Sequence, residues 1–249
     1  MSWHVVVGPI AVCQWAPWLS SGLSHAMVGC PHDFRASTRS AALEKLAHEG
    51  AFQPAAPVRW LRQTHSTILY GLAVPASAGI SPYTEGLEGD GFVFRRGVLD
   101  GSVAITTADC LPVMMLSGDF GALVHAGWRG LADGIVTDAA RRLFELSRAP
   151  IEVAIFPHAS SRRYEVGEEV INAFPANLCE TARNSEGNQQ RLDLSATARA
   201  MMLAAQIPIA AWHDATKEEN GCTISHNTWY SHRRDGEKSG RNATFVAIG

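Results

Sequence analysis

The chain has 249 residues and a formal net charge of −3, with 46% hydrophobic and 18% charged residues. This balance is typical of a soluble globular protein that buries a sizeable core without disulfide staples. It excludes a general nucleic-acid-binding protein, because neutralising phosphates requires clustered Lys and Arg.

The N-terminal half of the sequence predicts short strands and one helix. Apolar runs predict strands at 5–7, 11–14, 58–61, 68–72 and 92–94. Residues 37–48 predict a helix that Ser37 or Thr38 can cap and that Gly50 can end. Residues 20–36 show no periodicity and residues 75–89 are rich in Pro, Gly and Ser, so we predict loops there.

The C-terminal half predicts the centre of the fold. Continuous apolar runs at 103–106, 111–116 and 122–124 favour strands buried on both faces. Further strands are predicted at 151–156, 209–212 and 244–248, and helices at 131–146, 168–174 and 194–206. Because no repeat and no linker interrupts the pattern, we expect one mixed α/β (α+β) domain over residues 1–249.

The cysteines and the N-terminus indicate the compartment. Five scattered cysteines without a C-x-x-C pair make a poor disulfide framework, so reduced thiols in a cytoplasmic protein fit better. The apolar N-terminal run has no Lys or Arg before Arg35 and is interrupted by Gly8 and Pro9, which argues against a secretory signal. No run approaches the roughly 20 apolar residues of a membrane span.

Three candidate metal ligands lie at the ends of apolar runs. Cys110 and His125 fall within the stretches 107–113 and 124–130, and His65 lies in the segment 62–66. Two imidazoles and a thiolate suit zinc or copper, whereas magnesium and calcium prefer oxygen ligands. Such a set leaves a fourth position for water, phosphate or substrate, as in catalytic zinc sites.

The segments around these residues resemble the YfiH-like family. That family is variously named multicopper polyphenol oxidase (laccase), purine nucleoside phosphorylase and peptidoglycan editing factor. The matching residues are Gln63-x-His65, Ala108-Asp109-Cys110-Leu111-Pro112-Val113 and His125-Ala126-Gly127-Trp128-Arg129-Gly130. Weaker matches follow in the same order at 164–167, 192–194, 222–223 and 233–235. The resemblance runs from about residue 60 to the C-terminus and implies mixed sheets in a layered sandwich flanked by helices.

The resemblance also implies a function. It suggests a zinc-dependent purine nucleoside phosphorylase acting on adenosine, inosine, guanosine and methylthioadenosine, with adenosine deaminase activity beside it. His65, Cys110 and His125 are then both the catalytic residues and the ligands of Zn²⁺, or alternatively of Cu²⁺. The residues expected to bind the nucleoside and phosphate are Gln63, Asp109, Trp128, Arg129 and Arg234. Its expected partners are small-molecule substrates, namely a purine nucleoside and phosphate, and it is expected to bind no nucleic acid and no membrane. The enzyme is expected to be a monomer or a homodimer.

Elementary chemistry leaves alternatives open for these residues. The planar guanidinium of Arg129 suits phosphate or carboxylate, but it could form a structural ion pair. Asp109 could orient a ligand imidazole through its second ring nitrogen, or it could accept backbone N–H bonds at a strand end. Trp128 could stack on a base or simply roof the site, and Arg234 could lie in a solvated turn.

Three segments depart from the family pattern. Residues 20–36 lack the usual Ser-Thr-Arg-x-Gly-Gly-like turn and Asn-Leu-Gly segment. Residues 156–160 read Phe-Pro-His-Ala-Ser where Gly-Pro-x-Ile-Gly is common, and His232 stands where Tyr is common. A Gly-rich turn lets backbone approach a ligand closely, so its absence predicts an altered substrate preference or weaker activity.

Other function classes remain open. A copper polyphenol oxidase could hold one copper at the His-Cys-His set, but a multicopper laccase needs many more ligands, typically in His-x-His pairs that this chain lacks. A metal-free cysteine hydrolase, acting in peptidoglycan editing, would use Cys110 as nucleophile and His125 as base. A binding module with a structural metal would need a fourth protein ligand. The usual zinc-deaminase signature is absent, so deamination would need another acid–base group such as Asp109 or Asp235.

Overall fold

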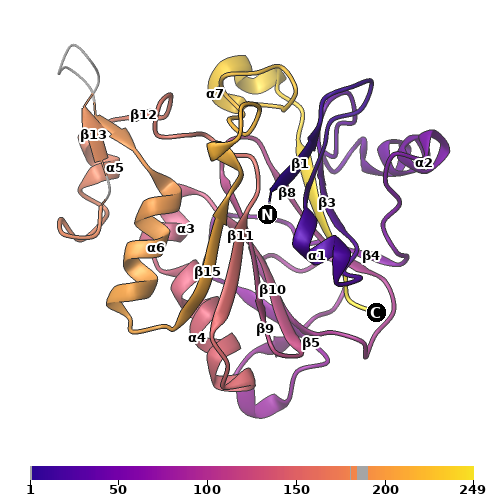
Figure 1. Ribbon diagram of the computed structural model, residues 1–249, viewed down its shortest axis with the longest axis horizontal. Coiled ribbons are helices and arrows are strands. Elements are labelled where there is room, and N and C mark those ends of the chain that lie inside the picture. The colour runs from indigo at the N-terminus through magenta and orange to yellow at the C-terminus, as the bar shows by residue number, and fades with distance from the viewer. Residues whose placement is uncertain (1, 180, 184–189) are drawn as a thin grey trace.

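Two mixed β-sheets lie face to face in the centre of the protein, and helices cover their outer faces (Figure 1). The computed structural model describes residues 2–179, 181–183 and 190–249. The first sheet has the order β1-β2-β3-β16-β8-β4 and is antiparallel except for the parallel pair β8 and β4. Its strands are β1 Trp3–Val6, β2 Val12–Trp15, β3 His25–Val28, β16 Asn242–Ala247, β8 Ser102–Thr107 and β4 Val58–Arg59.

The second sheet has the order β15-β11-β9-β10-β7-β5-β6. It is antiparallel from β11 to β7, and the outer pairs β15–β11, β7–β5 and β5–β6 are parallel. Its strands are β15 Ile209–Asp214, β11 Ile151–Ile155, β9 Leu111–Ser117, β10 Phe120–Ala126, β7 Gly91–Arg95, β5 Leu69–Leu72 and β6 Ser81–Pro82. A small third sheet joins β12 Glu165–Val166, β14 Gln190–Leu192 and β13 Thr181–Arg183.

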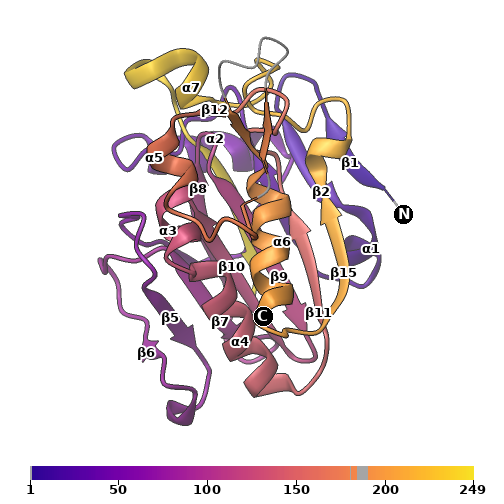
Figure 2. The same cartoon turned by 90° about the vertical axis from the view of Figure 1, so that its left-hand side faces the viewer.

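Amphipathic helices complete the layers. Helix α2, Arg39–Glu49, packs Ala42 and Leu46 on the outer face of the first sheet. On the other side α3 Trp128–Ala132, α4 Ile135–Ser147 and α6 Leu194–Ala204 cover the second sheet, and Figure 2 shows α4 and α6 side by side. Short α1 Ala16–Ser20, α5 Glu168–Ile171, α7 His232–Asp235, η1 Ala76–Ala78, η2 Ala215–Lys217 and η3 Gly236–Lys238 lie in the connections.

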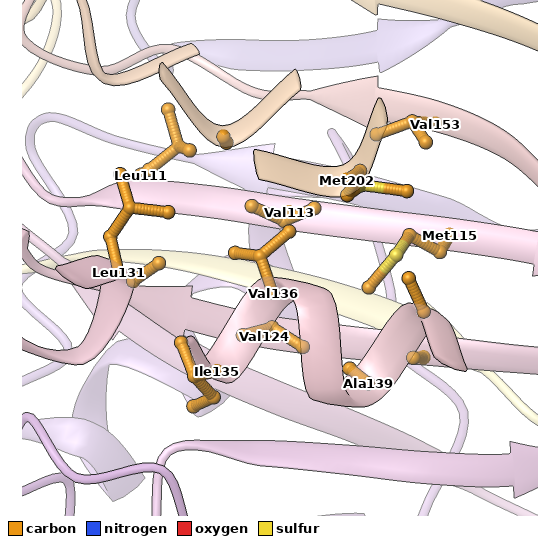
Figure 3. Close-up of a cluster of buried hydrophobic side chains, with 14 of the residues drawn as sticks. Leu111, Val113, Met115, Val124, Leu131, Ile135, Val136, Ala139, Val153 and Met202 are labelled. Atoms are coloured by element: carbon orange, nitrogen blue, oxygen red, sulfur yellow. The ribbon is translucent and has the colours of Figure 1, made fainter. Parts of the chain in front are cut away.

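The core is divided among these layers. Large apolar side chains from both sheets fill the space between them, among them Met27, Val103, Ile105, Phe92, Phe94 and Met114. Ile135, Val136 and Ala139 of α4 pack on Val113 and Val124 of the second sheet (Figure 3). Fully burying a side chain of this size contributes about 1.5–3 kcal/mol. The packing therefore makes the strands a rigid support for the loops at their ends.

The predicted mixed α/β fold is confirmed, and so is the burial of the continuous apolar runs as β8, β9 and β10. The predicted stop of α2 is also confirmed, because Gly50 ends that helix with a φ of 68°. Thr38 is its N-cap residue, but its hydroxyl donates to the carbonyls of Asp33 and Arg35 and makes no cap bond.

Three predictions of secondary structure were wrong. The loop predicted at 75–89 contains η1 and the short strand β6, which pairs with β5. The loop predicted at 20–36 contains β3, a buried strand between β2 and β16. The single helix predicted at 131–146 is two helices, because Gly134 has a φ of 94° and separates α3 from α4. Since α3 already begins at Trp128, this residue and Arg129 are helical and not part of a loop. Within the described residues, no helix is long and apolar enough to cross a membrane.

Candidate functional site

Strands β9 and β10 place two candidate ligands beside each other. Their register pairs His125 with Pro112 and Ala126 with Leu111. Cys110, which immediately precedes β9, therefore lies beside the end of β10. The His125 side chain is buried, whereas Cys110 is half-buried and can be reached from solvent.

His65 joins them from the loop between β4 and β5. Its Nε2 lies 3.8 Å from Cys110 Sγ, and its ring centroid lies 4.9 Å from that of His125, with the rings at 71°. One possible donor atom from each residue lies within 4.8 Å of the other two. His65 has a φ of 60°, which is uncommon for a residue other than glycine and is typical of backbone held in place for a function.

Gly127, the N-cap of α3, makes room for this cluster. A Cβ added at this position would clash with the His65 ring and would lie 3.2 Å from His65 Nε2 and 3.3 Å from Cys110 Sγ. Its φ of −67° is accessible to any residue, so the need for glycine here is steric. The missing side chain allows three donors from three chain segments to converge.

Buried Asp90 holds the His125 imidazole and the backbone of the loop that carries His65 in position. Its carboxylate accepts hydrogen bonds from the backbone N–H groups of Thr64, His65 and Ser66 and from the Ser66 hydroxyl. It also lies 2.8 Å from His125 Nδ1, which leaves Nε2 of that ring for the cluster. Metal-bound histidines commonly make such a second bond, which fixes their orientation.

The pKa of Asp90 reflects these contacts. Burial raises it, but the hydrogen bond and positive charge of His125 and the hydrogen bonds of Ser66 outweigh burial and lower it to about 2. The carboxylate is therefore ionised at neutral pH. Sequence reasoning missed this residue, for which the available signal was a charged side chain directly before the buried strand β7.

Asp109, which sequence analysis considered for this orienting role, contacts other groups. Its carboxylate accepts a hydrogen bond from the Thr223 hydroxyl at 2.6 Å and another from the Arg233 backbone N–H at 2.6 Å. Its own φ of 93° is unusual for a non-glycine residue. The bonds tie α7 and the 222–223 segment to the residue before Cys110, so Asp109 supports the backbone that carries the thiol.

Cys110 and His125 form a charged pair. Burial raises the pKa of the Cys110 thiol, but the positive charge of His125 and hydrogen bonds from both imidazoles outweigh it and lower the pKa to about 6. Burial lowers the pKa of His125, but the negative charge of Cys110 and the bond to Asp90 raise it to about 9. A thiolate is the form of cysteine that binds metals and attacks carbonyl groups.

The cluster lies in a cleft of about 540 Å³, within the usual range for small-molecule sites. Among the described residues, the wall contains five arginines and three histidines but no aspartate or glutamate. These basic residues are Arg35, Arg39, Arg62, Arg129, Arg241, His65, His125 and His232. The cleft is therefore strongly electropositive, although the whole chain carries a net charge of −3. Such a surface favours an anionic ligand.

Two of the predicted substrate-binding residues line the cleft. Gln63 is held there because its amide exchanges hydrogen bonds with the backbone N–H and carbonyl of Thr106. Arg129 is exposed, and its guanidinium lies over the Trp128 ring, 4.2 Å from the ring centroid. The planar fork of Arg129 is thus supported by an aromatic face while it borders the cleft.

The other predicted substrate-binding residues have structural contacts. Trp128 packs against the core cluster of the second sheet. Arg234 donates to the carbonyls of Thr223, His226 and Trp229 and pairs with the Asp235 carboxylate, so its guanidinium organises the 223–235 segment. The further cleft arginines 35, 39, 62 and 241 were missed, because they come from separate segments and share no motif.

Comparisons with known proteins identify the family of this chain. The family model described as multi-copper polyphenol oxidoreductase laccase matches residues 33–249, which include all the site residues discussed above. The chain is 33% identical over 200 residues to adenosine deaminase RL5 from an unknown prokaryotic organism, covering 75% of this chain and 72% of that protein. It is 35% identical over 199 residues to a purine nucleoside phosphorylase of Bacteroides thetaiotaomicron, covering 75% and 71%.

A solved structure shares the fold. The hypothetical protein YfiH of Bacillus licheniformis superposes with a TM-score of 0.76 at 21% sequence identity, over 99% of each chain. The arrangement of the two sheets and their helices is therefore common to both proteins.

Proposed function

We propose that this chain, which belongs to the family described as multi-copper polyphenol oxidoreductase laccase, is a zinc-dependent purine nucleoside phosphorylase with accessory adenosine deaminase activity. The observation that carries the proposal is the convergence of His65, Cys110 and His125 on one wall of a cationic cleft. The names of two relatives support the reaction class. Adenosine, inosine, guanosine and methylthioadenosine are the proposed substrates.

The donor set fits zinc. In a tetrahedral site with Zn–N of about 2.0–2.1 Å and Zn–S of about 2.3 Å, a nitrogen and a sulfur ligand lie about 3.6 Å apart. The 3.8 Å between His65 Nε2 and Cys110 Sγ is close to this value. Asp90 fixes the Nδ1 side of His125, and Cys110 readily becomes a thiolate, so each group can present its ligand atom.

The same donors argue against a multi-copper site. His65, Cys110 and His125 are the one group of three or more clustered candidate ligands in the described part of the chain. A laccase needs several coppers to reduce oxygen, and one such set can hold a single ion. Zinc, which undergoes no redox chemistry, suits group transfer to phosphate better.

The chain's own residues supply binding and proton transfer. Phosphorolysis breaks the bond between the purine nitrogen and ribose C1′, forms a bond from phosphate oxygen to C1′, and leaves the purine with a proton. Arg129 would bind and orient the phosphate, and the cationic wall would keep it close to C1′. Zinc held by His65, Cys110 and His125 would supply Lewis acidity.

His232 is the proposed proton donor to the purine. It is exposed, lines the cleft and carries an imidazole, a side chain that can donate and accept a proton. The carboxylates considered from sequence are engaged elsewhere: Asp109 accepts from Thr223 and Arg233, and Asp235 pairs with Arg234.

One observation favours a second candidate, a metal-free cysteine hydrolase. The charged pair of Cys110 and His125, with Asp90 on the far nitrogen of the imidazole, has the order of a nucleophile, base and orienting acid. In this alternative Cys110 would attack a carbonyl carbon, and His125 would return its proton to the leaving group. His65 would then have no catalytic role.

Two substitutions of Cys110 separate these functions. Cys110→Ala removes one of three protein ligands, so we expect metal content and the release of adenine and ribose 1-phosphate from adenosine to fall together, by about 10–100-fold or more. Cys110→Asp retains a possible oxygen ligand and should keep part of both. Cys30→Ala, which removes another half-buried thiol, is the matched control.

The outcomes point in different directions. An aspartate variant that is inactive although it is folded and retains its metal would support Cys110 as a covalent nucleophile. Full phosphorolysis by Cys110→Ala would contradict both candidates.

A further inference from the structure

The first sheet contributes a separate part of the cleft wall. Arg39 is the first residue of α2, Thr107 is the last residue of β8, and Arg241 immediately precedes β16. Since β8 and β16 pair with Thr107 opposite Asn242, Arg241 lies beside the end of β8. All three residues line the cleft. They belong to α2, β8 and the residue before β16, whereas Cys110, His125 and Arg129 belong to β9, β10 and α3 or to the residues next to them.

Among the described residues, the guanidinium groups of two arginines in this wall form no ion pair, and the backbone N–H of one of them, Arg241, donates to the Asp33 carboxylate. Of the five cleft arginines, Arg35 pairs with Asp33 and Arg62 pairs with Glu88. Among the described residues, no ion pair is formed by Arg39, Arg129 or Arg241. Arg129 is assigned above to the phosphate that reacts. The part of the wall next to the first sheet, called here the first-sheet wall, contains Arg39, Thr107 and Arg241. Its two arginines carry positive charges that a phosphate ion bound at Arg129 would not neutralise.

These cations are held in place. The Arg39 guanidinium lies 4.0 Å from the centroid of the Trp60 ring, and Arg241 Nη1 donates to the carbonyls of Ser239 and Gly240. Burial lowers the pKa of Arg39 from its ordinary value, but a guanidinium remains charged at neutral pH. A partly desolvated, oriented cation binds an anion more strongly than one free in water.

Unpaired polar atoms mark the same wall. Thr107 is 2% exposed, and its Oγ1 has no hydrogen-bond partner among the described residues. The buried Nε of Arg39 also has no partner there. Buried polar groups are nearly always hydrogen-bonded, so a hydroxyl and an N–H without partners on residues that line the cleft indicate a ligand with acceptor oxygens.

We propose that Arg39, Arg241 and Thr107 form a second anion subsite, which binds a phosphoryl group carried on the ribose of the substrate, so that the site takes purine nucleoside 5′-monophosphates. The proposal rests on the proposed function, because it places ribose C1′ at the metal-ligand wall. The 5′-oxygen lies across the sugar ring from C1′ and can point toward the first-sheet wall. The cleft volume of about 540 Å³ can contain a nucleotide.

Binding measurements test the subsite without requiring turnover. Calorimetric titration of the metal-loaded protein with 5′-AMP, adenosine and inorganic phosphate should give an affinity for 5′-AMP at least about tenfold higher than for adenosine, because charged hydrogen bonds are the strong ones. Arg39→Gln and Arg241→Gln should bring this ratio close to 1. Arg62→Gln, which changes a cleft arginine already paired with Glu88, should preserve it.

Thr107→Val provides a second test that does not depend on charge. Valine has nearly the same shape, and no hydrogen bond made by the Thr107 hydroxyl is lost within the described residues. We expect the affinity ratio to fall by about tenfold or more, the effect of one hydrogen bond to a charged group. Circular dichroism of each variant verifies the fold.

The outcomes keep the two proposals apart. Equal affinities for 5′-AMP and adenosine in the wild-type protein would overturn the subsite, whether or not adenosine is phosphorolysed. Inorganic phosphate that binds to the Arg39 and Arg241 side chains, without any preference for the nucleotide, would also overturn it. A nucleotide preference in a protein that does not phosphorolyse adenosine would contradict the proposed function and leave the subsite standing.

Discussion

Substituting Asp90 with asparagine tests the organisation of the candidate site. Asparagine preserves the shape of the side chain but removes its charge and turns one acceptor into an NH₂ donor. One side of Asp90 faces the N–H of Thr64 and the N–H and hydroxyl of Ser66, and the other faces His65 N–H and His125. Both sides of the side chain face backbone N–H donors. The NH₂ group of asparagine would therefore face at least one N–H donor whichever way the amide is turned.

The expected magnitude follows from these contacts. The fall in the Asp90 pKa from 3.8 to about 2 corresponds to roughly 2 kcal/mol in favour of the charged form in the folded protein. Because hydrogen bonds to charged groups contribute about 1.5–3 kcal/mol each, we expect the free energy of unfolding to decrease by a few kcal/mol. Losing the partner of a ligand imidazole should weaken zinc binding by about 10–100-fold.

Competition of the folded variant with a zinc chelator measures the metal affinity, and urea denaturation measures the stability. Asp109→Asn is the matched comparison, because Asp109 is also buried and accepts two hydrogen bonds but contacts neither imidazole. We expect a smaller loss of zinc affinity for Asp109→Asn than for Asp90→Asn. The reverse order would refute the assignment of Asp90 as the residue that orients the His125 imidazole and the His65 backbone.

Three further predictions concern the site and the fold. Gly127→Ala should leave the protein folded but weaken zinc binding by about tenfold or more, because the added Cβ displaces the His65 ring; chelator competition equal to wild type would contradict this. In metal-free protein, alkylation of Cys110 should accelerate as pH rises through about 6, since its pKa is lowered and the thiolate forms above that pH; a midpoint near 9 would contradict the charged pair with His125. Limited proteolysis should yield no two independently folded halves, because we expect one cooperative domain over residues 1–249, and denaturation should be a single transition.

The elements predicted correctly are those whose signal is local. Strands β8, β9 and β10 are continuous apolar runs, and α4 carries its apolar stripe within its own sequence. Strand β3 was missed because it has only four residues, of which the first is His25, and its burial depends on pairing with β16 from the far end of the chain. The break at Gly134 was missed because one glycine within an apolar pattern does not reveal its φ.

The candidate site was predictable to the extent that its residues stand in recognisable segments. The resemblance placed His65, Cys110 and His125 together, although their order along the chain says nothing about the distance between strand ends. Asp90 could not be found this way, because its role arises only when the 64–66 loop folds over it. Arg39 and Arg241 become neighbours of the site only through the pairing of β8 with β16 and the packing of α2.

The most direct test of the central claim is zinc-dependent phosphorolysis by the purified protein. The metal is removed with a chelator, zinc is returned in steps, and phosphate-dependent release of adenine and ribose 1-phosphate from adenosine is measured together with bound zinc. We expect turnover to be lost on removal and to recover in proportion to bound zinc, up to one ion per chain. Full turnover by the metal-free protein, or none with zinc bound, would contradict the claim.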